Sequence, residues 1–366
     1  MSEDLAAGQT IASDASCIRL VLVGPMPPPL HGQTVVMNHI VSELAPIFPR
    51  MRIANNSEGD TKGWLRTIVK LRRVLGQLMS VRDCDVVYIA VKARHGMWIT
   101  AVVAFLARLA RIRVFLHHHS YLYVRERKTR MVALARAAGP TACHIVLSQS
   151  MASELIRLTP EVTRSIVVGN AALIDKSLSD LPIKADSTEL VLGHMSDLSF
   201  EKGFGEVVDL AVKLKEAGVR ARLIVGGPAI HGETRRHLDR ASQELGDLFE
   251  YRGVLAGESK RSFYNDITHF VLPSRDEAVP LVLYEAMAAG VVCVATRQGS
   301  IPEQLARSPS LLAYCADSFV EEILPILSRS PVSAVSSQEC KQAYLGALAE
   351  SEAQLAHLVE LLKGES

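Results

Sequence analysis

The chain has 366 residues, of which 48% are apolar, 22% charged and 5% aromatic. Its length predicts two domains, its composition excludes a disordered or fibrous protein, and its few aromatic residues argue against a surface that binds nucleic acid by base stacking. The net charge of +1 conceals an asymmetry, because residues 1–185 carry +10 and residues 186–366 carry −9. This split favours two bodies with different electrostatic partners, although a chance difference between two domains would also produce it.

The cysteines and the apolar runs indicate the compartment. None of the six cysteines forms a C-x-x-C pair, which argues against a structural zinc site or a disulfide framework and fits a reducing environment. The first 16 residues lack the features of a secretion signal. The longest nearly uncharged apolar run, residues 96–107, is shorter than the roughly 20 residues of a membrane span. We therefore expect a soluble, cytoplasmic protein.

Short, β-branched apolar runs alternate with helical patterns along the whole chain, which is typical of an α/β protein with buried parallel strands. The runs are residues 18–23, 85–91, 113–116, 144–148, 166–168, 190–193, 222–225, 269–273 and 291–295. A polar segment without an apolar face, residues 173–188, divides them. The pattern predicts two facing Rossmann-like domains, residues 17–172 and 189–335. Residues 337–363 are predicted to form a C-terminal helix that packs back on the first domain.

The loop after the first predicted strand has the sequence GPMPPPLHGQT, residues 24–34. Gly32 opens the following helix, and a helix N-terminus with an exposed backbone is suited to a phosphate group. The loop is neither a G-x-G-x-x-G nor a Walker sequence, so dinucleotide or ATP use is not supported. An ordinary tight turn is the alternative interpretation.

Three consecutive histidines, His117, His118 and His119, follow the third predicted strand. Neighbouring side chains on an extended chain point to opposite faces, so at most two of them could share a metal ion. No second cluster with ligand spacing accompanies them, and we predict no metal site. The favoured hypothesis is that one imidazole lies in the cleft between the domains and bonds a substrate hydroxyl.

Two glycine-containing turns in the second half are candidate phosphate sites. Lys202 precedes Gly203 where a helix begins, so its ammonium and the helix N-terminus could together hold a diphosphate. Gly226 opens a Gly-Gly-Pro turn after another predicted strand. A solvated lysine and an ordinary turn are the alternatives.

The most specific segment is PSRDEAVPLVLYEAMAAG, residues 273–290. Glu277 lies in the loop after a predicted strand, and Glu285 lies eight positions later in a helix that Pro280 starts. A carboxylate can accept two hydrogen bonds from a vicinal diol, so the pair suits a sugar and a ribose. A helix-capping glutamate and a solvated glutamate are the alternative, but the apolar neighbours of Glu285 predict that it is partly buried.

Together these segments resemble glycosyltransferase family 4, the group 1 glycosyl transferases, which are retaining, nucleotide-sugar-dependent enzymes of the GT-B fold. The resemblance rests on the E-x(7)-E pair of Glu277 and Glu285, on S-x-x-K-G at residues 199–203, on the PPPLHGQT loop and on a V-x-N-like segment at residues 168–171. It implies retention of anomeric configuration, a UDP- or GDP-linked donor, and no required metal or cofactor.

The resemblance also implies roles for single residues. Glu277 would contact the donor hexose, Glu285 the nucleotide ribose, and Lys202 the leaving diphosphate. His118, with His119 as second choice, would lie beside the sugar. Gly226 and Gly32, the latter together with His31, would belong to the donor-binding loops. No dedicated side-chain base is needed, because the diphosphate can accept the acceptor's proton on the same face.

Three positions depart from the family pattern. The arginine usually found five residues before the lysine is Asp197 here, and Arg275 or Arg297 could replace it. Ala278 stands where the family has glycine, and His31 replaces the first glycine of the usual Gly-Gly in the first loop. These changes affect the identity of the donor more than the class of reaction.

The sequence therefore predicts a glycosyltransferase that uses a saccharide or lipid-linked acceptor in surface polysaccharide or glycoconjugate synthesis. A non-catalytic nucleotide-sugar-binding protein and a nucleotide-sugar epimerase of the same fold are the alternatives. The basic first half, with residues 70–75 and 106–111 as interleaved basic and apolar segments, predicts peripheral docking to an anionic membrane on its inner face.

Overall fold

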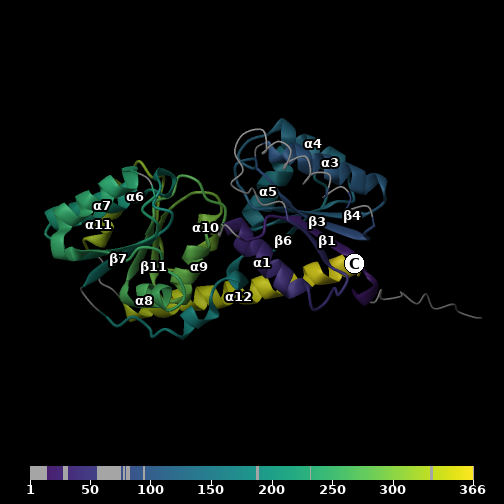
Figure 1. Cartoon of the computed structure of the whole chain (residues 1–366). Helices are drawn as coiled ribbons and strands as arrows, with labels where there is room; N and C mark the ends of the chain where they lie inside the picture. The colour runs from purple at the N-terminus through teal and green to yellow at the C-terminus, as the bar shows by residue number, and fades with distance from the viewer. Residues whose placement is uncertain are drawn as a thin grey trace, which may run out of the picture.

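The computed structural model describes residues 15–27, 32–55, 76, 79, 83–93, 95–186, 189–230, 232–329 and 333–365. Two six-stranded parallel sheets, each covered by helices, form two domains that lie side by side (Figure 1). The predicted α/β class with two Rossmann-like domains is thus confirmed.

The first sheet has the strand order β2-β1-β3-β4-β5-β6. Its strands are β1 (Leu20–Gly24), β2 (Arg52–Asn55), β3 (Val86–Val91), β4 (Arg113–His118), β5 (Cys143–Val146) and β6 (Ser165–Val167). Helices α3 (Gly96–Leu109), α4 (Thr129–Ala138) and α5 (Gln149–Leu158) bury their apolar sides on one face. Helix α1 (Gly32–Leu44) covers the other face, and short 3₁₀ helices η1 (Ala15–Cys17) and η2 (Ala171–Leu173) flank the domain.

The second sheet has the order β12-β11-β10-β7-β8-β9. Its strands are β7 (Leu190–Met195), β8 (Ala221–Gly226), β9 (Phe249–Tyr251), β10 (His269–Leu272), β11 (Val292–Thr296) and β12 (Leu311–Ala313). Helices α6 (Phe204–Glu216), α7 (Gly232–Leu245) and α11 (Phe319–Leu327) cover one face. Helices α8 (Glu258–Asp266), α9 (Leu281–Ala288) and α10 (Ile301–Gln304) cover the other, and η4 (Phe200–Lys202) and η5 (Gly246–Leu248) are 3₁₀ turns.

Three strands were not predicted from the sequence: β2, β9 and β12. Each lies at an edge of its sheet and has only three or four residues. Edge strands have one paired neighbour and keep partly exposed side chains, so they do not show the continuous apolar run that marks the central strands. The nine predicted runs correspond to the other nine strands.

The strand orders fix where a ligand can bind. All strands of a sheet are parallel, but the order in which successive strands are added reverses once. This reversal lies between β1 and β3 in the first sheet and between β7 and β10 in the second. Ligands of open parallel sheets bind outside the carboxyl ends of the strands at such a switch point. The connections after β1, β7 and β10 lie at these switch points; they lead to Gly32 at the start of α1, to Lys202 in η4 and to Glu277.

The C-terminal helix α12 (Ala334–Lys363) connects the two domains along one side (Figure 1). Its first half packs against α9, and its last turns bury Leu358 and Leu362 in the core of the first domain. The Arg113 guanidinium donates hydrogen bonds to the carbonyls of Leu361 and Leu362, at 3.0 and 2.8 Å, and so caps the helix. The helix packs back on the first domain, as the sequence predicted.

The segment predicted to connect the domains is anchored to the protein. It carries the 3₁₀ helix η3 (Lys176–Asp180) and buries the side chains of Ile174, Leu178 and Leu181. These three residues belong to the same apolar cluster as α9. The segment therefore contributes to the core rather than running over the surface.

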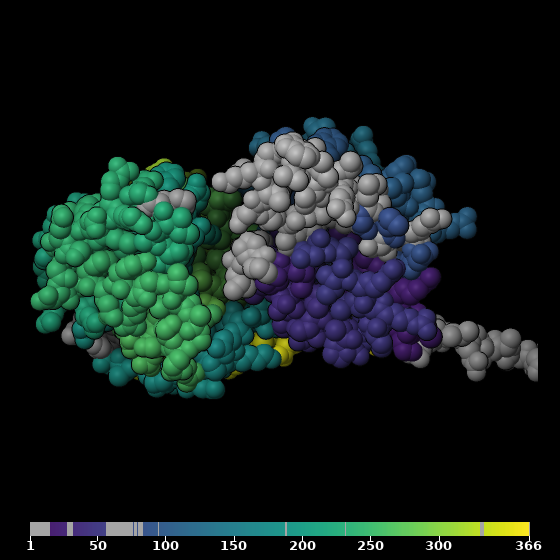
Figure 2. All heavy atoms as spheres, in the orientation of Figure 1, coloured from purple at the N-terminus to yellow at the C-terminus, as the bar shows by residue number. Residues whose placement is uncertain are grey.

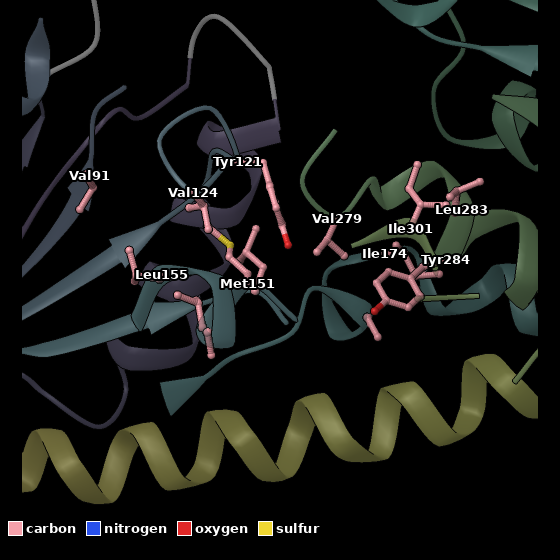
Figure 3. Close-up of a cluster of buried hydrophobic side chains, with 14 of the residues drawn as sticks. Val91, Tyr121, Val124, Met151, Leu155, Ile174, Val279, Leu283, Tyr284 and Ile301 are labelled. Atoms are coloured by element: carbon pink, nitrogen blue, oxygen red, sulfur yellow. The ribbon is translucent and has the colours of Figure 1, made fainter. Parts of the chain in front are cut away.

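Side chains of both domains meet directly beside the gap between them. The Glu303 carboxylate accepts the backbone N–H groups of Gln149 and Ser150, at 2.8 and 2.7 Å, at the start of α5. An anion at a helix N-terminus is stabilising, because those N–H groups otherwise lack partners. In Figure 3, Tyr121 of the first domain points toward Val279 of the second within one apolar cluster. These contacts hold the two sheets in a fixed relation.

Among the described residues, five histidines are buried on strands: His117, His118, His144, His194 and His269. Burial lowers the pKa of all five, for the last three to about 4. The pKa of an unfolded histidine is about 6.5. The unfolded chain therefore takes up protons before the native protein does.

We expect the free energy of unfolding to fall as the pH drops from 6.5 toward 4. Each histidine that protonates in the unfolded state alone adds a slope of up to about 1.4 kcal/mol per pH unit. Urea unfolding at pH 7.5, 6 and 5 measures this slope, with the exposed His357→Gln as a control that leaves it unchanged. An equal unfolding free energy at pH 7.5 and 5 would contradict the assignment of neutral buried imidazoles.

Candidate functional site

A cavity of about 650 Å³ lies between the domains, at the carboxyl edges of both sheets. The first domain contributes Gly32, Gln33 and His119 to its lining, and the second contributes Lys202, Glu277 and Glu285. Figure 2 shows the two domains as separate lobes with a recess between them. Gly32, His119, Lys202, Glu277 and Glu285, which the sequence singled out from distant parts of the chain, thus line one cavity.

Lys202 and Glu277 form an ion pair in this cavity. The ammonium donates to Glu277 Oε1 at 2.7 Å, and the Ser274 hydroxyl donates to the same oxygen at 2.9 Å. The Glu277 side chain is 9% exposed and that of Lys202 29% exposed. The pair joins the loop after β7 to the loop after β10, which are neighbouring strands. A cation and a carboxylate are thereby placed at the switch point of the second sheet.

Gly203 makes this approach possible. Its φ of +71° lies in the left-handed region, and a Cβ built on it would lie 2.2 Å from the carbonyl oxygen of Pro273. No side chain fits there, because the obstacle is backbone. The glycine of S-x-x-K-G therefore lets η4 lie against the end of β10, which sets the position of Lys202.

Glu285 is buried in α9 and held by two residues of α8 that the sequence analysis missed. The Lys260 ammonium donates to Glu285 Oε1 at 2.6 Å, and the Tyr264 hydroxyl donates to Oε2 at 2.9 Å. The Glu285 side chain is 8% exposed, which confirms the predicted burial. Lys260 and Tyr264 are four positions apart, on one side of a helix. That spacing is the sole sequence signal for the pair, and it does not point to Glu285.

His119 lines the cavity, whereas His118 does not. Both ring nitrogens of His119 are buried and lack a hydrogen-bond partner in the structure. Burial lowers the pKa of His119 to about 3, so the ring is neutral. A buried imidazole without a partner is costly unless a ligand supplies one. Its nitrogens are therefore available to a bound molecule.

His118, the first choice from the sequence, lies in the interior of the first domain. Its Nδ1 is 3.2 Å from the Tyr123 hydroxyl, and its Nε2 is 2.9 Å from Nδ1 of His144. Both nitrogens are engaged within the core. Successive side chains of an extended chain point to opposite faces. The side chain of His118 therefore points into the core, and that of the next residue, His119, lines the cavity.

The predicted glycines differ in their positions. Gly32 lines the cavity, and a Cβ there would meet no heavy atom within 4 Å, so its backbone faces open space. Gly226 does not line the cavity; its missing Cβ makes room for Leu255, which does. His31, predicted beside Gly32, lies outside the described residues, as does the basic segment 70–75.

Neither arginine proposed to replace the family arginine faces the cavity. Arg275 pairs with Glu206 at 2.6 Å and Asp317 at 2.8 Å, and its guanidinium lies over the Phe200 ring. Arg297 is exposed and does not line the cavity. Asp197 itself accepts hydrogen bonds from the backbone N–H and hydroxyl of Ser199. Both arginines, which the sequence left open as replacements for the family arginine, thus lie outside the lining of this cavity.

The histidine triplet does not gather around a common point suited to a metal. The Tyr88 hydroxyl bonds His117 Nδ1, while His118 bonds Tyr123 and His144. Within the described ranges, no group of three or more His, Cys, Asp or Glu residues is placed to hold a metal ion. In the same part of the chain, no helix combines the length and the apolar character that crossing a bilayer demands.

Two alanine substitutions test the role of Gly203. Gly218 has φ of +77° with nothing within 4 Å of a built Cβ, so Gly218→Ala should cost about 1 kcal/mol for the left-handed conformation alone. Gly203→Ala adds a clash with the backbone of Pro273, and we expect a loss of about 3 kcal/mol or more. Urea unfolding measures both free energies. Equal losses for the two variants would show that the close approach at Gly203 is unimportant.

Comparison with known proteins agrees with this geometry. A family model described as Glycosyl transferases group 1 matches residues 189–329. A protein of Escherichia coli K12 with the provisional name colanic acid biosynthesis glycosyltransferase WcaL is 32% identical over 34% of this chain and 32% of its own length. A Bacillus subtilis protein provisionally named glycosyltransferase EpsF is 30% identical over 45% of this chain and 44% of its own. The chain thus spans less than half of these relatives.

Solved structures resemble the whole chain. HepE of Anabaena, in complex with UDP, has a TM-score of 0.69 at 16% identity and covers 95% of this chain and 100% of its own. Sucrose-phosphate synthase of Thermosynechococcus elongatus has a TM-score of 0.68 at 15% identity, with 94% and 98% covered. Residues 189–329 therefore match the group 1 glycosyl transferases, and the whole chain has the predicted GT-B fold.

Proposed function

We propose that this protein is a retaining glycosyltransferase that moves a sugar from a UDP- or GDP-linked donor to a saccharide or lipid-linked acceptor in surface polysaccharide synthesis. The observation that carries the proposal is the interdomain cavity, which unites Lys202, Glu277, Glu285 and His119. The names of the relatives WcaL and EpsF, and the UDP and UDP-glucose complexes of the structurally similar HepE, support the reaction class.

The proposed function implies one orientation of the donor in the cavity. Lys202, at the start of α6, supplies positive charge for the diphosphate, and the backbone at Gly32 faces it from the first domain. Glu285 lies deeper and accepts the ribose hydroxyls, while Glu277 accepts those of the hexose. His119 donates or accepts one hydrogen bond from the sugar. Lys202 is a protein cation placed on the leaving group, so we expect turnover to persist in EDTA.

The weak basicity of the described cavity residues supports the proposed retention of anomeric configuration. Both carboxylates are tied to lysines, at 2.7 and 2.6 Å. A histidine whose pKa is about 3 is too weak a base to take a proton from a sugar hydroxyl at neutral pH. The proton of the acceptor can instead pass to the departing diphosphate oxygen on the same face. Lys202 then stabilises that leaving group, an effect that preorganised donors can supply at roughly 3–4 kcal/mol each.

Glu277→Ala tests this assignment. Because Glu285 and Lys202 remain, UDP or GDP should still bind, but without the hexose contact transfer should fall at least about a hundredfold. Nucleotide release on mixing with a donor panel and a membrane extract gives the rate, and calorimetry gives the affinity. The exposed Glu216→Gln is the matched control. Unchanged release in Glu277→Ala would contradict the role, and binding without turnover in the unaltered protein would favour a nucleotide-sugar-binding protein.

We further propose that the first domain docks on an anionic membrane through α3. One side of this helix exposes Trp98, Val102, Phe105 and Leu109, each 46–65% accessible, while its other side packs on the sheet. Helices α3 and α4 lie on the side of the first sheet away from α12 (Figure 1). The exposed Arg111 lies just after the C-terminal end of this apolar side. Residues 1–185, which include the first domain, carry a net charge of +10. An apolar face next to basic residues suits an anionic lipid surface.

Vesicle flotation tests the docking. The protein should float with vesicles that contain phosphatidylglycerol and not with phosphatidylcholine alone. Val102→Ser/Phe105→Ser should lower the bound fraction about tenfold or more, because two exposed apolar side chains no longer insert. Val254→Ser, at a 72% exposed position of the second domain, should have no effect. Equal flotation with both lipids would refute the proposal.

A further inference from the structure

The charges that line the described part of the cavity cancel in pairs. Its positive side chains are Lys202 and Lys260, and its negative ones are Glu277 and Glu285. Each lysine contacts one glutamate, at 2.7 and 2.6 Å. A nucleoside diphosphate brings at least two negative charges into this neutral space, and burying them without matching cations is costly.

The described lining holds no lysine or arginine besides Lys202 and Lys260 that could neutralise the charge of the diphosphate. Asp197 replaces the family arginine and adds negative charge near the loop, while Arg275 is held by Glu206 and Asp317 outside the cavity. Among the described lining residues, a second cation can come only from one that is already paired. Lys260 is such a residue, on the opposite wall from the first-domain loops.

The contacts of Glu285 allow Lys260 to leave. Tyr264 is fully buried and donates to Oε2, so the carboxylate keeps one fixed partner when Oε1 is released. The Lys260 side chain is 23% exposed and has a flexible four-carbon stem, whereas Glu285 is 8% exposed and fixed in α9. Of the two partners in this ion pair, the lysine is the one that can move.

We propose that Lys260 exchanges partners when the donor binds: its ammonium leaves Glu285 and contacts the diphosphate, and the freed carboxylate oxygen accepts a ribose hydroxyl. This inference rests on the proposed glycosyltransferase function. It assigns Lys260 two linked tasks, as the second phosphate cation and as the group that occupies the ribose site in the empty protein. After the exchange Lys260 faces the phosphates, and the Glu285 carboxylate accepts hydrogen bonds from the Tyr264 hydroxyl and from the ribose.

The exchange links recognition of the ribose to recognition of the phosphates. A nucleoside without phosphates offers Lys260 no new partner, so its ribose must compete with an ion pair for Glu285 and should bind weakly. A nucleoside diphosphate supplies both replacements at once. Removing the ammonium should therefore have opposite effects on the two kinds of ligand.

Calorimetric titration with UDP, GDP, uridine and guanosine tests the exchange. In Lys260→Met, the affinity for the diphosphate should fall about tenfold or more, since a charge-assisted contact is lost, while the nucleoside binds as well or better. Lys260→Arg should restore most of the diphosphate affinity. Lys260→Met/Glu285→Gln leaves no unpaired buried carboxylate and should still bind the diphosphate weakly. The exposed Lys213→Met is the control.

The outcomes separate this inference from the function on which it rests. Parallel losses of nucleoside and diphosphate affinity in Lys260→Met would mean that Lys260 merely positions Glu285, and parallel gains would mean that it merely blocks the site; either result overturns the exchange. If the unaltered protein binds none of the four ligands, the proposed function itself fails. Diphosphate binding that depends on Lys202 but not on Lys260 would retain the function and reject the exchange.

Discussion

The arrangement of the cavity depends on the ion pair between Lys202 and Glu277. The two residues follow β7 and β10, strands that are neighbours in the sheet although 75 positions separate the side chains. The pair forms because Gly203 lets η4 approach the backbone of Pro273 at a distance that no other residue tolerates. A cation and a buried carboxylate are thereby held together at the switch point of the second sheet.

The cavity is complete only when the two domains are held together, because both contribute residues to its lining. The second domain alone supplies the two Lys–Glu pairs, but His119 and Gly32 reach the cavity from the first sheet. Helix α12, capped by Arg113, and the contact of Glu303 with the start of α5 fix the distance between the sheets. These remote contacts therefore keep Glu277 and His119 on the lining of one cavity.

Much of the fold and part of the site could be predicted from the sequence, for physical reasons that particular residues make clear. Central strands are buried on both faces and read as apolar runs, whereas β2, β9 and β12 are edge strands with mixed sequences. Glu277, Glu285 and Lys202 lie in recognisable segments beside strand ends. His118 and His119 could not be separated, because one residue of register decides which side chain faces the cavity. Lys260 was missed because its partner is 25 positions away in another helix.

A crystal structure of the protein with UDP or GDP tests the central claim most directly. The account predicts density for the nucleotide in the interdomain cavity, with a diphosphate oxygen within hydrogen-bond distance of the Lys202 ammonium and the ribose against Glu285. A nucleotide bound outside this cavity, or one whose phosphates point away from Lys202, would contradict it.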